Sequence, residues 1–305
     1  MIKTPIQDLG SFDGNHLWIK RDDLIPFSFG GNKARKAELF FEEIDRGSYD
    51  TVVTYGSSSS NHCRIISNAC AGRNLACYII SPKEEEHEDT FNRKMMILFG
   101  AQIITVPVAE VHDTIEYTLD VLRRQGKKPF FIAGGGHGNI GTESYVRCYE
   151  EIREQEKEMN VRFDNIYFAC GTGTTQAGLV CGQLLANEER TIIGISIARK
   201  NPRCREVVTD SVRSYLNGRI AEDVIERSVI VNDSYTSGYG KEDPEVIKTI
   251  KEVLMTFGIP LDATYTGKAF MGMKSLLKQQ TGRNVLFIHT GGTPLFFDIL
   301  ERTEL

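Results

Sequence analysis

Short apolar runs alternate with helical patterns along this chain, and the alternation limits the folds open to it. Eight runs rich in β-branched and aromatic residues occupy residues 51–56, 75–80, 102–108, 129–135, 165–171, 191–198, 228–233 and 284–292. Each is continuous, which is typical of strands buried on both faces of a sheet. Apolar residues at helical spacing lie between them, as in 61–72, 113–125, 141–158 and 243–257. This alternation predicts an α/β fold with mostly parallel sheets.

The chain is long enough for more than one domain. Its 305 residues are more typical of two domains than of one. Eight strands allow a TIM barrel, one wide sheet or two smaller sheets, and the strand pattern does not choose among them. The charged helix predicted over residues 143–158 has the character of a connector between two halves.

Composition and charge disfavour several classes of protein. The chain is 41% hydrophobic and 25% charged, as ordinary folded proteins are. Its net charge is −5 and its basic residues are scattered, which argues against a nucleic-acid partner. No apolar stretch approaches the roughly 20 residues that span a membrane. The first residues lack the apolar core of a signal peptide, so we expect no membrane partner and a cytoplasmic location.

The cysteines are expected to be buried free thiols. The chain has seven of them, without a C-x-x-C pair, and several lie in apolar runs. Together with the six histidines they show no zinc-type spacing, so we predict no metal site.

Four of the predicted strands end in turns of small polar residues. These turns read GSSSSNH at 56–62, GGGHGNIG at 134–141, CGTGTTQAG at 170–178 and HTGG at 289–292. In open α/β sheets, ligands bind beyond the carboxyl ends of the strands. The four turns therefore predict a cleft for a small polar ligand.

The turn at 171–178 has the features of a phosphate site. It follows a predicted strand and opens a helix, whose first N–H groups and dipole favour an anion. Gly171 and Gly173 permit tight backbone geometry, and Thr172, Thr174 and Thr175 add hydroxyl donors. The alternative is a plain turn before a capped helix.

The pattern favours a cofactor with one phosphate. A P-loop would need a lysine that is missing from 171–178. GHGNIG at 136–141 matches a dinucleotide-binding pattern, but the next predicted strand ends in Ala169 and Cys170 rather than in an acidic residue. A nicotinamide oxidoreductase is therefore disfavoured.

Several ordered segments resemble one family of enzymes. The first, FSFGGNKARKAELF at 27–40, places Lys33 directly after two glycines and an asparagine. It resembles the opening of the 1-aminocyclopropane-1-carboxylate deaminase and D-cysteine desulfhydrase family, which are fold-type II pyridoxal phosphate enzymes. Further matching segments span nearly the whole chain and lie at 4–9, 56–71, 129–146, 170–179, 233–240, 262–273 and 286–292.

The resemblance implies a fold of two domains. Each would be an open, mostly parallel twisted sheet flanked by helices, with the cofactor in the cleft between them. Residues 1–44 with 155–305 would form the larger, cofactor-binding domain, and residues 45–154 the smaller α/β domain. The family further implies a homodimer.

The resemblance also assigns roles to residues of this chain. Lys33 would carry pyridoxal 5'-phosphate as an imine and later move the α-proton, while Lys36 would be solvated. Gly30 and Gly31 would let the backbone approach the cofactor, and Asn32 would cap the helix. The remaining cofactor contacts would be Asn61 to the phenolic oxygen, Gly171, Thr172, Gly173, Thr174 and Thr175 to the phosphate, Thr290 to the pyridine nitrogen and Tyr265 near the ring.

Substrate contacts follow from the same resemblance. Ser59 and Ser60 would hold the carboxylate, and Ser60, Tyr265 and Tyr239 would take part in catalysis with Lys33. His62, His137 and Tyr239 complete the substrate contacts. The alternatives are a core histidine for His62, a loop residue for His137 and packing aromatics for the two tyrosines.

Two positions favour the desulfhydrase branch. The cyclopropane deaminases carry a glutamate where this chain has Thr266 and an apolar residue where it has Thr290. We therefore expect α,β-elimination on a small amino acid, with D-cysteine first. Ser59 and His137 depart from the family pattern, which leaves L-cysteate, 2,3-diaminopropionate, D-serine, 1-aminocyclopropane-1-carboxylate and racemisation open. A catalytically silent sensor that binds the cofactor is the alternative of another class.

Overall fold

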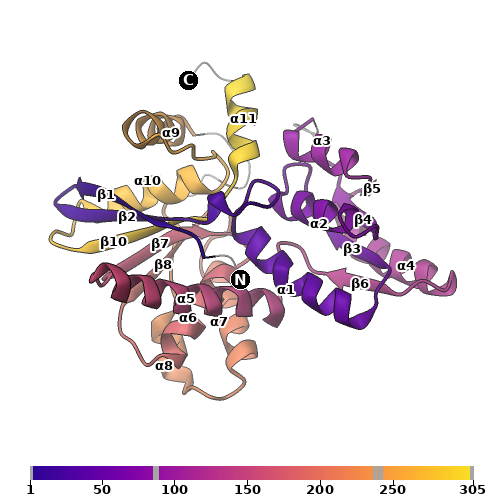
Figure 1. The fold of residues 1–305 in the computed structure, drawn as a ribbon, viewed down its shortest axis with the longest axis horizontal. Helices are drawn as coiled ribbons and strands as arrows, with labels where there is room; N and C mark the ends of the chain where they lie inside the picture. The colour runs from indigo at the N-terminus through magenta and orange to yellow at the C-terminus, as the bar shows by residue number, and fades with distance from the viewer. Residues whose placement is uncertain (1–2, 85–88, 236–237, 239–242, 303–305) are drawn as a thin grey trace. The chain divides into compact units, whose positions relative to one another are not determined.

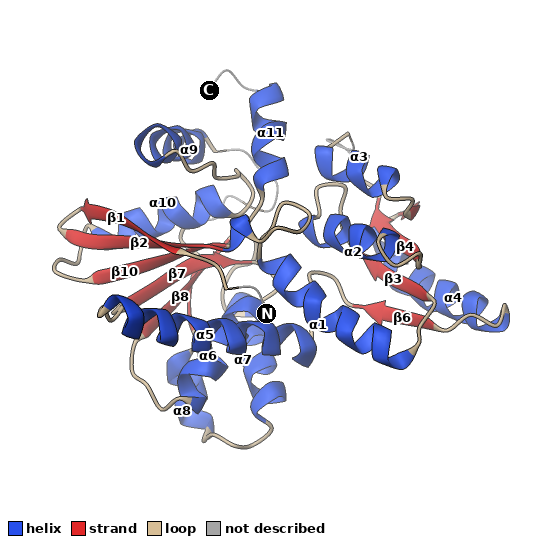
Figure 2. Cartoon of the chain, in the orientation of Figure 1, coloured by secondary structure: helices blue, strands red, loops and turns tan. Residues whose placement is uncertain are grey.

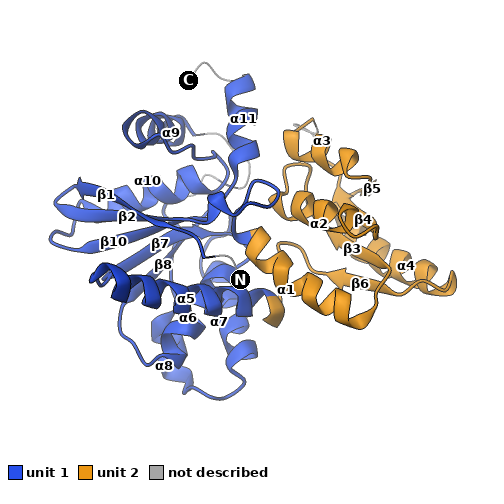
Figure 3. Cartoon of the chain, in the orientation of Figure 1, with its two compact units in different colours: residues 1–32, 141–305 blue, residues 33–140 orange. Residues whose placement is uncertain are grey.

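The chain divides into two compact units. The computed structural model describes residues 3–84, 89–235, 238 and 243–302. Unit 1 comprises Met1–Asn32 with Gly141–Leu305, and unit 2 comprises Lys33–Ile140 (Figure 3). The division predicted from the sequence assigns 33–44 and 141–154 the other way round. The role of those predicted domains stays a prediction.

Unit 1 is built on one sheet. Its described strands are β1 (Ile6–Phe12), β2 (Asn15–Arg21), β7 (Asn165–Cys170), β8 (Thr191–Ser196), β9 (Ile230–Asn232) and β10 (Asn284–His289). They pair in the order β1-β2-β10-β7-β8-β9, and every pair is parallel except β1 with β2. Along β7, Ile166 and Phe168 enter one core, whereas Tyr167 and Ala169 enter the other. Burial on both faces explains why the strand is apolar from Ile166 to Cys170.

Helices cover both faces of this sheet (Figures 1 and 2). One layer contains α5 (Asn139–Met159), α6 (Thr174–Leu185), α7 (Arg203–Leu216) and α8 (Glu222–Ser228). The other contains α9 (Pro244–Phe257), α10 (Thr266–Leu277) and α11 (Thr293–Arg302). A short 3₁₀ turn, η1 (Asp22–Leu24), follows β2. Two separate apolar cores result, one on each side of the sheet.

The β1–β2 hairpin is absent from the strands predicted above. It is joined by Asp13 and Gly14, whose φ angles are +47° and +74°. Two central residues with positive φ are the mark of a type I′ turn, for which Asp-Gly is a strong sequence signal. Both strands mix polar and apolar residues, so a continuous apolar run does not mark either of them.

Unit 2 is a smaller parallel α/β unit. Its described strands are β3 (Thr51–Tyr55), β4 (Ala76–Pro82), β5 (Gln102–Val106) and β6 (Pro129–Ile132), in the order β5-β4-β3-β6. Its helices are α1 (Asn32–Gly47), α2 (Asn61–Ala71), α3 (Phe91–Leu98) and α4 (Val111–Arg124), with η2 (Val108–Glu110) before α4. Apolar side chains of α4 pack on β3 and β4. Of the three arrangements that the sequence allowed, the described chain therefore has two sheets, and the predicted α/β fold is confirmed.

The described residues contain no disulfide, no membrane-spanning helix and no cluster of metal ligands. The seven cysteines, all within them, are buried and free, as predicted. Within the same residues no helix is both long and apolar enough to cross a membrane. No group of three or more His, Cys, Asp or Glu side chains there is arranged to hold a metal ion.

Candidate active site

The turn after β3 carries the predicted carboxylate-binding serines. Ser60 caps α2, and its Oγ accepts a hydrogen bond from the Cys63 N–H at 3.2 Å. Gly56 starts the turn, and a Cβ there would lie 2.8 Å from Ser60 Oγ and 2.7 Å from Cys63 Sγ. The turn is therefore packed against the first turn of α2. The Ser60 hydroxyl accepts from the helix and keeps its own proton for another partner.

Side chains of a second segment hold this turn in place. Thr90 Oγ1 donates to the Ser58 carbonyl at 2.7 Å, and Asn92 Nδ2 donates to the Ser59 carbonyl at 2.8 Å. The Ser58 N–H donates to Glu84 Oε2 at 3.0 Å. These supporting residues were not found from the sequence. Thr90 does show a local signal, because it caps α3, but nothing local connects it to a turn about 30 residues earlier.

Asn61 is oriented by two donors. Its Oδ1 accepts from Asn92 Nδ2 at 3.0 Å and from Arg64 Nη2 at 3.3 Å. An amide whose oxygen is engaged in this way must present its NH₂ group elsewhere. No residue in the described part of the chain accepts from Asn61 Nδ2 in a recorded hydrogen bond. Asn61 therefore offers the donor that its predicted contact with a phenolic oxygen requires.

His62 lies in the core of unit 2. It is 2% exposed, and its Nε2 lies 2.9 Å from Thr54 Oγ1. Because Thr54 donates its proton to the Ile132 carbonyl at 2.7 Å, His62 Nε2 is the donor in the first contact. Burial lowers the pKa of His62 well below its ordinary value, and the positive charges of Lys33 and Lys36 lower it further. His62 is therefore neutral, and its predicted contact with substrate stays a prediction.

Helix α1 contains two lysines, and one of them, Lys36, is not solvated as expected. Lys33, the second residue of α1, is half-buried. Lys36 is 1% exposed, and its Nζ donates to the Gly135 carbonyl at 3.1 Å. The prediction that Lys36 is solvated is wrong, because it lies on the buried face of α1 and binds the turn after β6. His137, in the same turn, is exposed.

In unit 1, the predicted phosphate loop begins a helix without a side-chain cap. Gly173 is the N-cap of α6 with φ +88°, and a Cβ there would lie 3.2 Å from Val208 Cγ2. Thr174 and Thr175 are buried, whereas Gly171 and Thr172 are half-buried. Helix N–H groups that no side chain caps, next to a glycine with left-handed backbone, suit an anion. These residues fit the phosphate of the expected cofactor.

The two glycines before Lys33 pack against backbone of their own unit. A Cβ on Gly31 would lie 2.6 Å from the Thr290 carbonyl oxygen, and one on Gly291 would lie 2.6 Å from Gly31 Cα. The Asn32 N–H donates to the Thr290 carbonyl at 2.9 Å, and Asn32 Nδ2 donates to Thr175 Oγ1 at 3.0 Å. Asn32 thus connects the turn after β10 to the phosphate loop, in addition to starting α1.

A buried aspartate organises the segment that contains Tyr265. Asp262 Oδ1 accepts from the Tyr265 N–H at 2.7 Å, and Oδ2 accepts from Thr266 Oγ1 at 2.7 Å. Burial raises the pKa of Asp262, and the hydrogen bonds from Thr266 and Tyr265 oppose that rise. A Cβ on Gly292 would lie 2.4 Å from Asp262 Oδ2. Asp262 was not predicted from the sequence, although an aspartate four residues before the first residue of a helix is a local signal.

The predicted site residues fall into two groups. Unit 2 contains Lys33, Ser59, Ser60, Asn61, His62 and His137, and unit 1 contains Gly171, Thr172, Gly173, Thr174, Thr175, Tyr265 and Thr290. Tyr239 lies outside the described residues. Near it in sequence, Lys268 Nζ donates to the Gly238 carbonyl at 2.6 Å. The roles assigned to these residues stay predictions.

Comparison with known proteins identifies the class. Residues 1–291 match the pyridoxal-phosphate dependent enzyme family, and the chain belongs to it. Lys33 and the loop at the start of α6 are the residues predicted above to hold that cofactor. The protein is therefore an enzyme whose cofactor is pyridoxal phosphate.

Closer relatives define the group within that class. A D-cysteine desulfhydrase of Serratia proteamaculans is 32% identical, covering 96% of this chain and 92% of the relative. A protein of Pyrococcus abyssi, provisionally named a 1-aminocyclopropane-1-carboxylate deaminase, is 34% identical, covering 97% and 91%. The crystal structure of an ACC deaminase homologue superimposes with a TM-score of 0.87 at 31% identity, over 99% of this chain and 93% of that one. The chain belongs to the 1-aminocyclopropane-1-carboxylate deaminase and D-cysteine desulfhydrase family.

Proposed function

We propose that the protein is a lyase that catalyses α,β-elimination on D-cysteine. With one water molecule, the reaction gives pyruvate, ammonia and hydrogen sulfide. The observation that carries the choice of branch is Thr266. It is fully buried and donates to Asp262, so the position that holds a glutamate in the cyclopropane deaminases serves the local structure here. A glutamate there would place a second carboxylate against a buried one, at a high desolvation cost.

The cofactor would be held by the residues that the sequence predicts. Lys33 would carry it, the loop 171–175 would bind its phosphate, and Asn61 would donate to its phenolic oxygen. Thr290 would face the ring nitrogen, and Tyr265 would lie beside the ring. When bound, pyridoxal phosphate supplies an acceptor for the electrons that an amino acid's α-carbon releases.

Side chains of this protein would bind the substrate and move its proton. The amino end of α2, with Ser59 and Ser60, would bind the carboxylate through N–H and hydroxyl donors. The Lys33 amine would take the α-proton. Once the substrate amine has replaced Lys33 at the cofactor, the freed Lys33 amine would lie within reach of the reacting carbon. Neutral His62 adds no positive charge near Lys33, which helps that amine to act as a base.

A second substrate class is favoured by His137. Its imidazole is exposed in the turn after β6, at a position where the family commonly has a serine. An imidazole there suits an anionic β-substituent such as the sulfonate of L-cysteate. Replacement of His137 by Ser should change the ranking of substrates more than it changes cofactor retention, and an unchanged ranking would reject a role in substrate binding.

A product assay tests the proposal. The holoenzyme would be offered D-cysteine, L-cysteine, D-serine, L-cysteate, 2,3-diaminopropionate and 1-aminocyclopropane-1-carboxylate, and pyruvate, 2-oxobutanoate, ammonia and sulfide would be measured. We expect the highest kcat/KM with D-cysteine. Turnover of the cyclopropane substrate above D-cysteine would overturn the choice of branch. The absence of any product or racemised amino acid would point to a silent cofactor-binding protein.

Lys33 has its own test. Borohydride should shift the visible absorbance of the holoenzyme and leave a reduced adduct on Lys33. Lys33→Ala should lose about 10²–10⁴-fold in kcat, the range expected for a proton-transferring group. Lys278→Ala, an exposed lysine at the end of α10, is the control and should leave kcat unchanged. The mass of the holoenzyme in solution tests the expected homodimer.

A further inference from the structure

A polar cavity lies at the amino ends of the strands in the unit 1 sheet. Its volume is about 550 Å³, and it is lined by residues at the amino ends of β7, β8 and β10. Asn165 and Thr191 begin two of these strands, and Arg283 directly precedes the third. The phosphate loop and Thr290 follow the carboxyl ends of the same strands. A six-residue strand is about 20 Å long, so the cavity is separate from those turns.

Apart from Arg190, the lining of the cavity carries two positive and two negative side chains. Arg162 Nη2 donates to the Glu189 carbonyl at 2.9 Å, and within the described residues no ion pair engages its guanidinium. The Glu189 carboxylate likewise has no recorded partner in that part of the chain. Arg283 Nη1 and Asp164 Oδ1 are 3.9 Å apart, and their side chains are 55% and 38% exposed. A pair this loose and exposed is weak, and a ligand can separate it at little cost.

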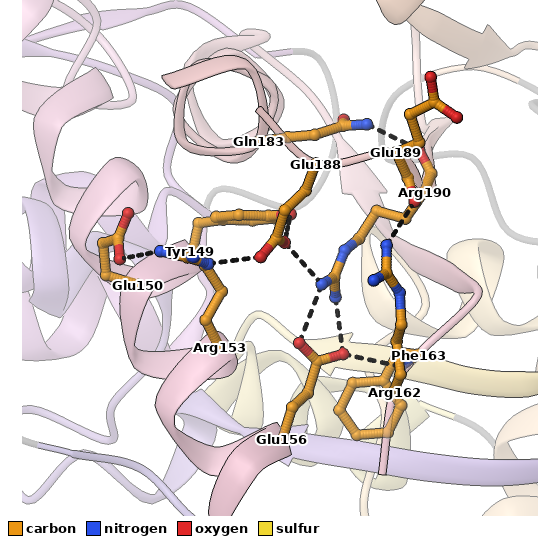
Figure 4. A network of polar contacts seen from close by, with 10 residues as sticks. All are labelled: Tyr149, Glu150, Arg153, Glu156, Arg162, Phe163, Gln183, Glu188, Glu189 and Arg190. Carbon is orange, nitrogen blue, oxygen red and sulfur yellow. Dashed lines mark hydrogen bonds and ion pairs between the residues drawn. The ribbon is translucent and has the colours of Figure 1, made fainter. Parts of the chain in front are cut away.

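Arg190 lines the cavity. Its side chain is held by a network of carboxylates (Figure 4). Its side chain is 2% exposed and binds both oxygens of Glu156, at 2.8 and 2.9 Å, and Glu188 at 2.8 Å. Glu156 Oε1 also accepts from the Phe163 N–H at 2.7 Å, which ties the network to the backbone. The buried Nε donor of Arg190 has no acceptor among the described residues. Its carboxylate partners therefore hold the Arg190 side chain in place beside the cavity.

The lining selects the chemistry of the ligand. Every residue that lines the cavity is charged or polar, which disfavours a nucleotide base, a flavin or an acyl chain. Arg190 is neutralised by Glu156 and Glu188, which disfavours a polyphosphate. Arg162 and Arg283 can receive one carboxylate, while Asp164 and Glu189 can receive one ammonium group. We propose that this cavity is a binding site for a free amino acid as a zwitterion.

This proposal does not depend on which amino acid the enzyme cleaves. An active-site substrate must reach Lys33, whereas the cavity is formed by unit 1 residues at the amino ends of the strands. The side chains of Asn165 and Gln280, joined by a 2.9 Å hydrogen bond, add neutral donors and acceptors next to the charged groups. A small polar side chain on the bound amino acid would suit this lining best.

Calorimetric titration of the full-length holoenzyme tests the site. Borohydride reduction of the cofactor link first removes amino-acid exchange at Lys33. Glycine, serine, alanine, asparagine and glutamine, each as D and L forms where they exist, are then titrated. Acetate, ethylamine and inorganic phosphate serve as probes that carry charge of one sign only. We expect at least one amino acid to saturate one site per chain, and to bind about tenfold more tightly than acetate or ethylamine, because hydrogen bonds to charged groups add on both sides.

Two variants and a control locate the binding. Arg162→Gln and Glu189→Gln change exposed side chains, so both should melt at the parent temperature and each should weaken amino-acid binding about tenfold or more. Arg227→Gln removes an equally exposed arginine that pairs with Asp223 on α8, and should bind like the parent. If either variant melts lower, the double change Asp164→Asn with Arg283→Gln replaces it.

Three results would overturn the proposal. The first is the absence of saturable binding by every amino acid of the panel. The second is acetate or phosphate binding as tightly as the best amino acid, which would show a simple anion site. The third is parent-like affinity in both charge-removing variants, which would place the binding elsewhere.

Discussion

The turn after β3 and the turn after β10 are both short and polar, yet they are held in different ways. Side chains from Thr90 and Asn92 hold the first, through hydrogen bonds to the Ser58 and Ser59 carbonyls. Backbone holds the second, where Gly31 and Gly291 allow two chain segments to touch. A turn held by several side chains should lose stability in small steps. A turn held by glycine contact has no room for a single added methyl group.

The glycine contact should give the largest effect. Gly31→Ala adds a Cβ 2.6 Å from the Thr290 carbonyl oxygen at φ +97°, so both sterics and backbone conformation oppose it. We expect a loss of about 2–4 kcal/mol in the free energy of unfolding, measured with urea. Gly258→Ala is the matched control, because φ is +68° there and a Cβ would meet nothing within 4 Å. It should cost only about 1–2 kcal/mol, and equal losses in the two variants would mean that the close contact is unimportant.

His62 should make stability depend on pH. Its folded pKa lies well below the ordinary 6.5. The unfolded chain therefore binds the extra proton first, so this stability is present above pH 6.5 and is lost as pH falls below it. The loss should approach about 1.4 kcal/mol per pH unit, and unfolding curves at pH 7 to 5 measure it. His62→Asn should flatten this slope, whereas Gly31→Ala should leave it unchanged. An equal slope in the parent and in His62→Asn would contradict the assignment of a neutral buried imidazole.

Asn92 should have a moderate effect on both stability and cofactor binding. Asn92→Ala removes the donor to the Ser59 carbonyl and the donor that orients Asn61. We expect a loss of about 1–2 kcal/mol in unfolding free energy and a shifted visible absorbance, because the Asn61 amide then keeps only the longer bond from Arg64. Asn68→Ala, at a half-buried asparagine of α2, is the control. A stability loss with an unchanged spectrum would mean that Asn92 acts on the turn alone.

Ser57 should have the smallest effect. Its Oγ lies 3.2 Å from Ser59 Oγ in a half-buried position, whereas Thr90 and Asn92 donate to the carbonyls of Ser58 and Ser59. Ser57→Ala should change the free energy of unfolding by less than about 0.5 kcal/mol. A loss as large as that of Asn92→Ala would show that the hydroxyl pair, rather than the bonds from α3, holds the turn.

Local patterns predicted much of the fold and the glycine turns. The eight predicted strands correspond to β3 through β10, because each of these strands contains a short run of apolar residues. Gly173 could also be predicted locally, because glycine adopts the positive φ that the residue before α6 requires. The hairpin of β1 and β2 also has a local signal, the turn residues Asp13 and Gly14, although its strands lack continuous apolar runs.

The supporting contacts could not be predicted in this way. Lys36 has the spacing of a solvated helix lysine, and its burial depends on a turn about 100 residues later. The support of the turn after β3 by Asn92 is equally remote in sequence. Asp262 is local to Tyr265, but its burial beside Gly292 is not.

The sequence by itself determined the α/β class, the glycine and serine turns and the placement of Lys33 after Gly30, Gly31 and Asn32, because each depends on neighbouring residues and their backbone preferences. Only the tertiary structure decided which donors reach those turns, that Lys36 is buried, and that Arg162, Asp164, Glu189 and Arg283 line one cavity. These facts depend on which distant segments the packed sheets bring together, and that information is not carried by any short stretch of the chain.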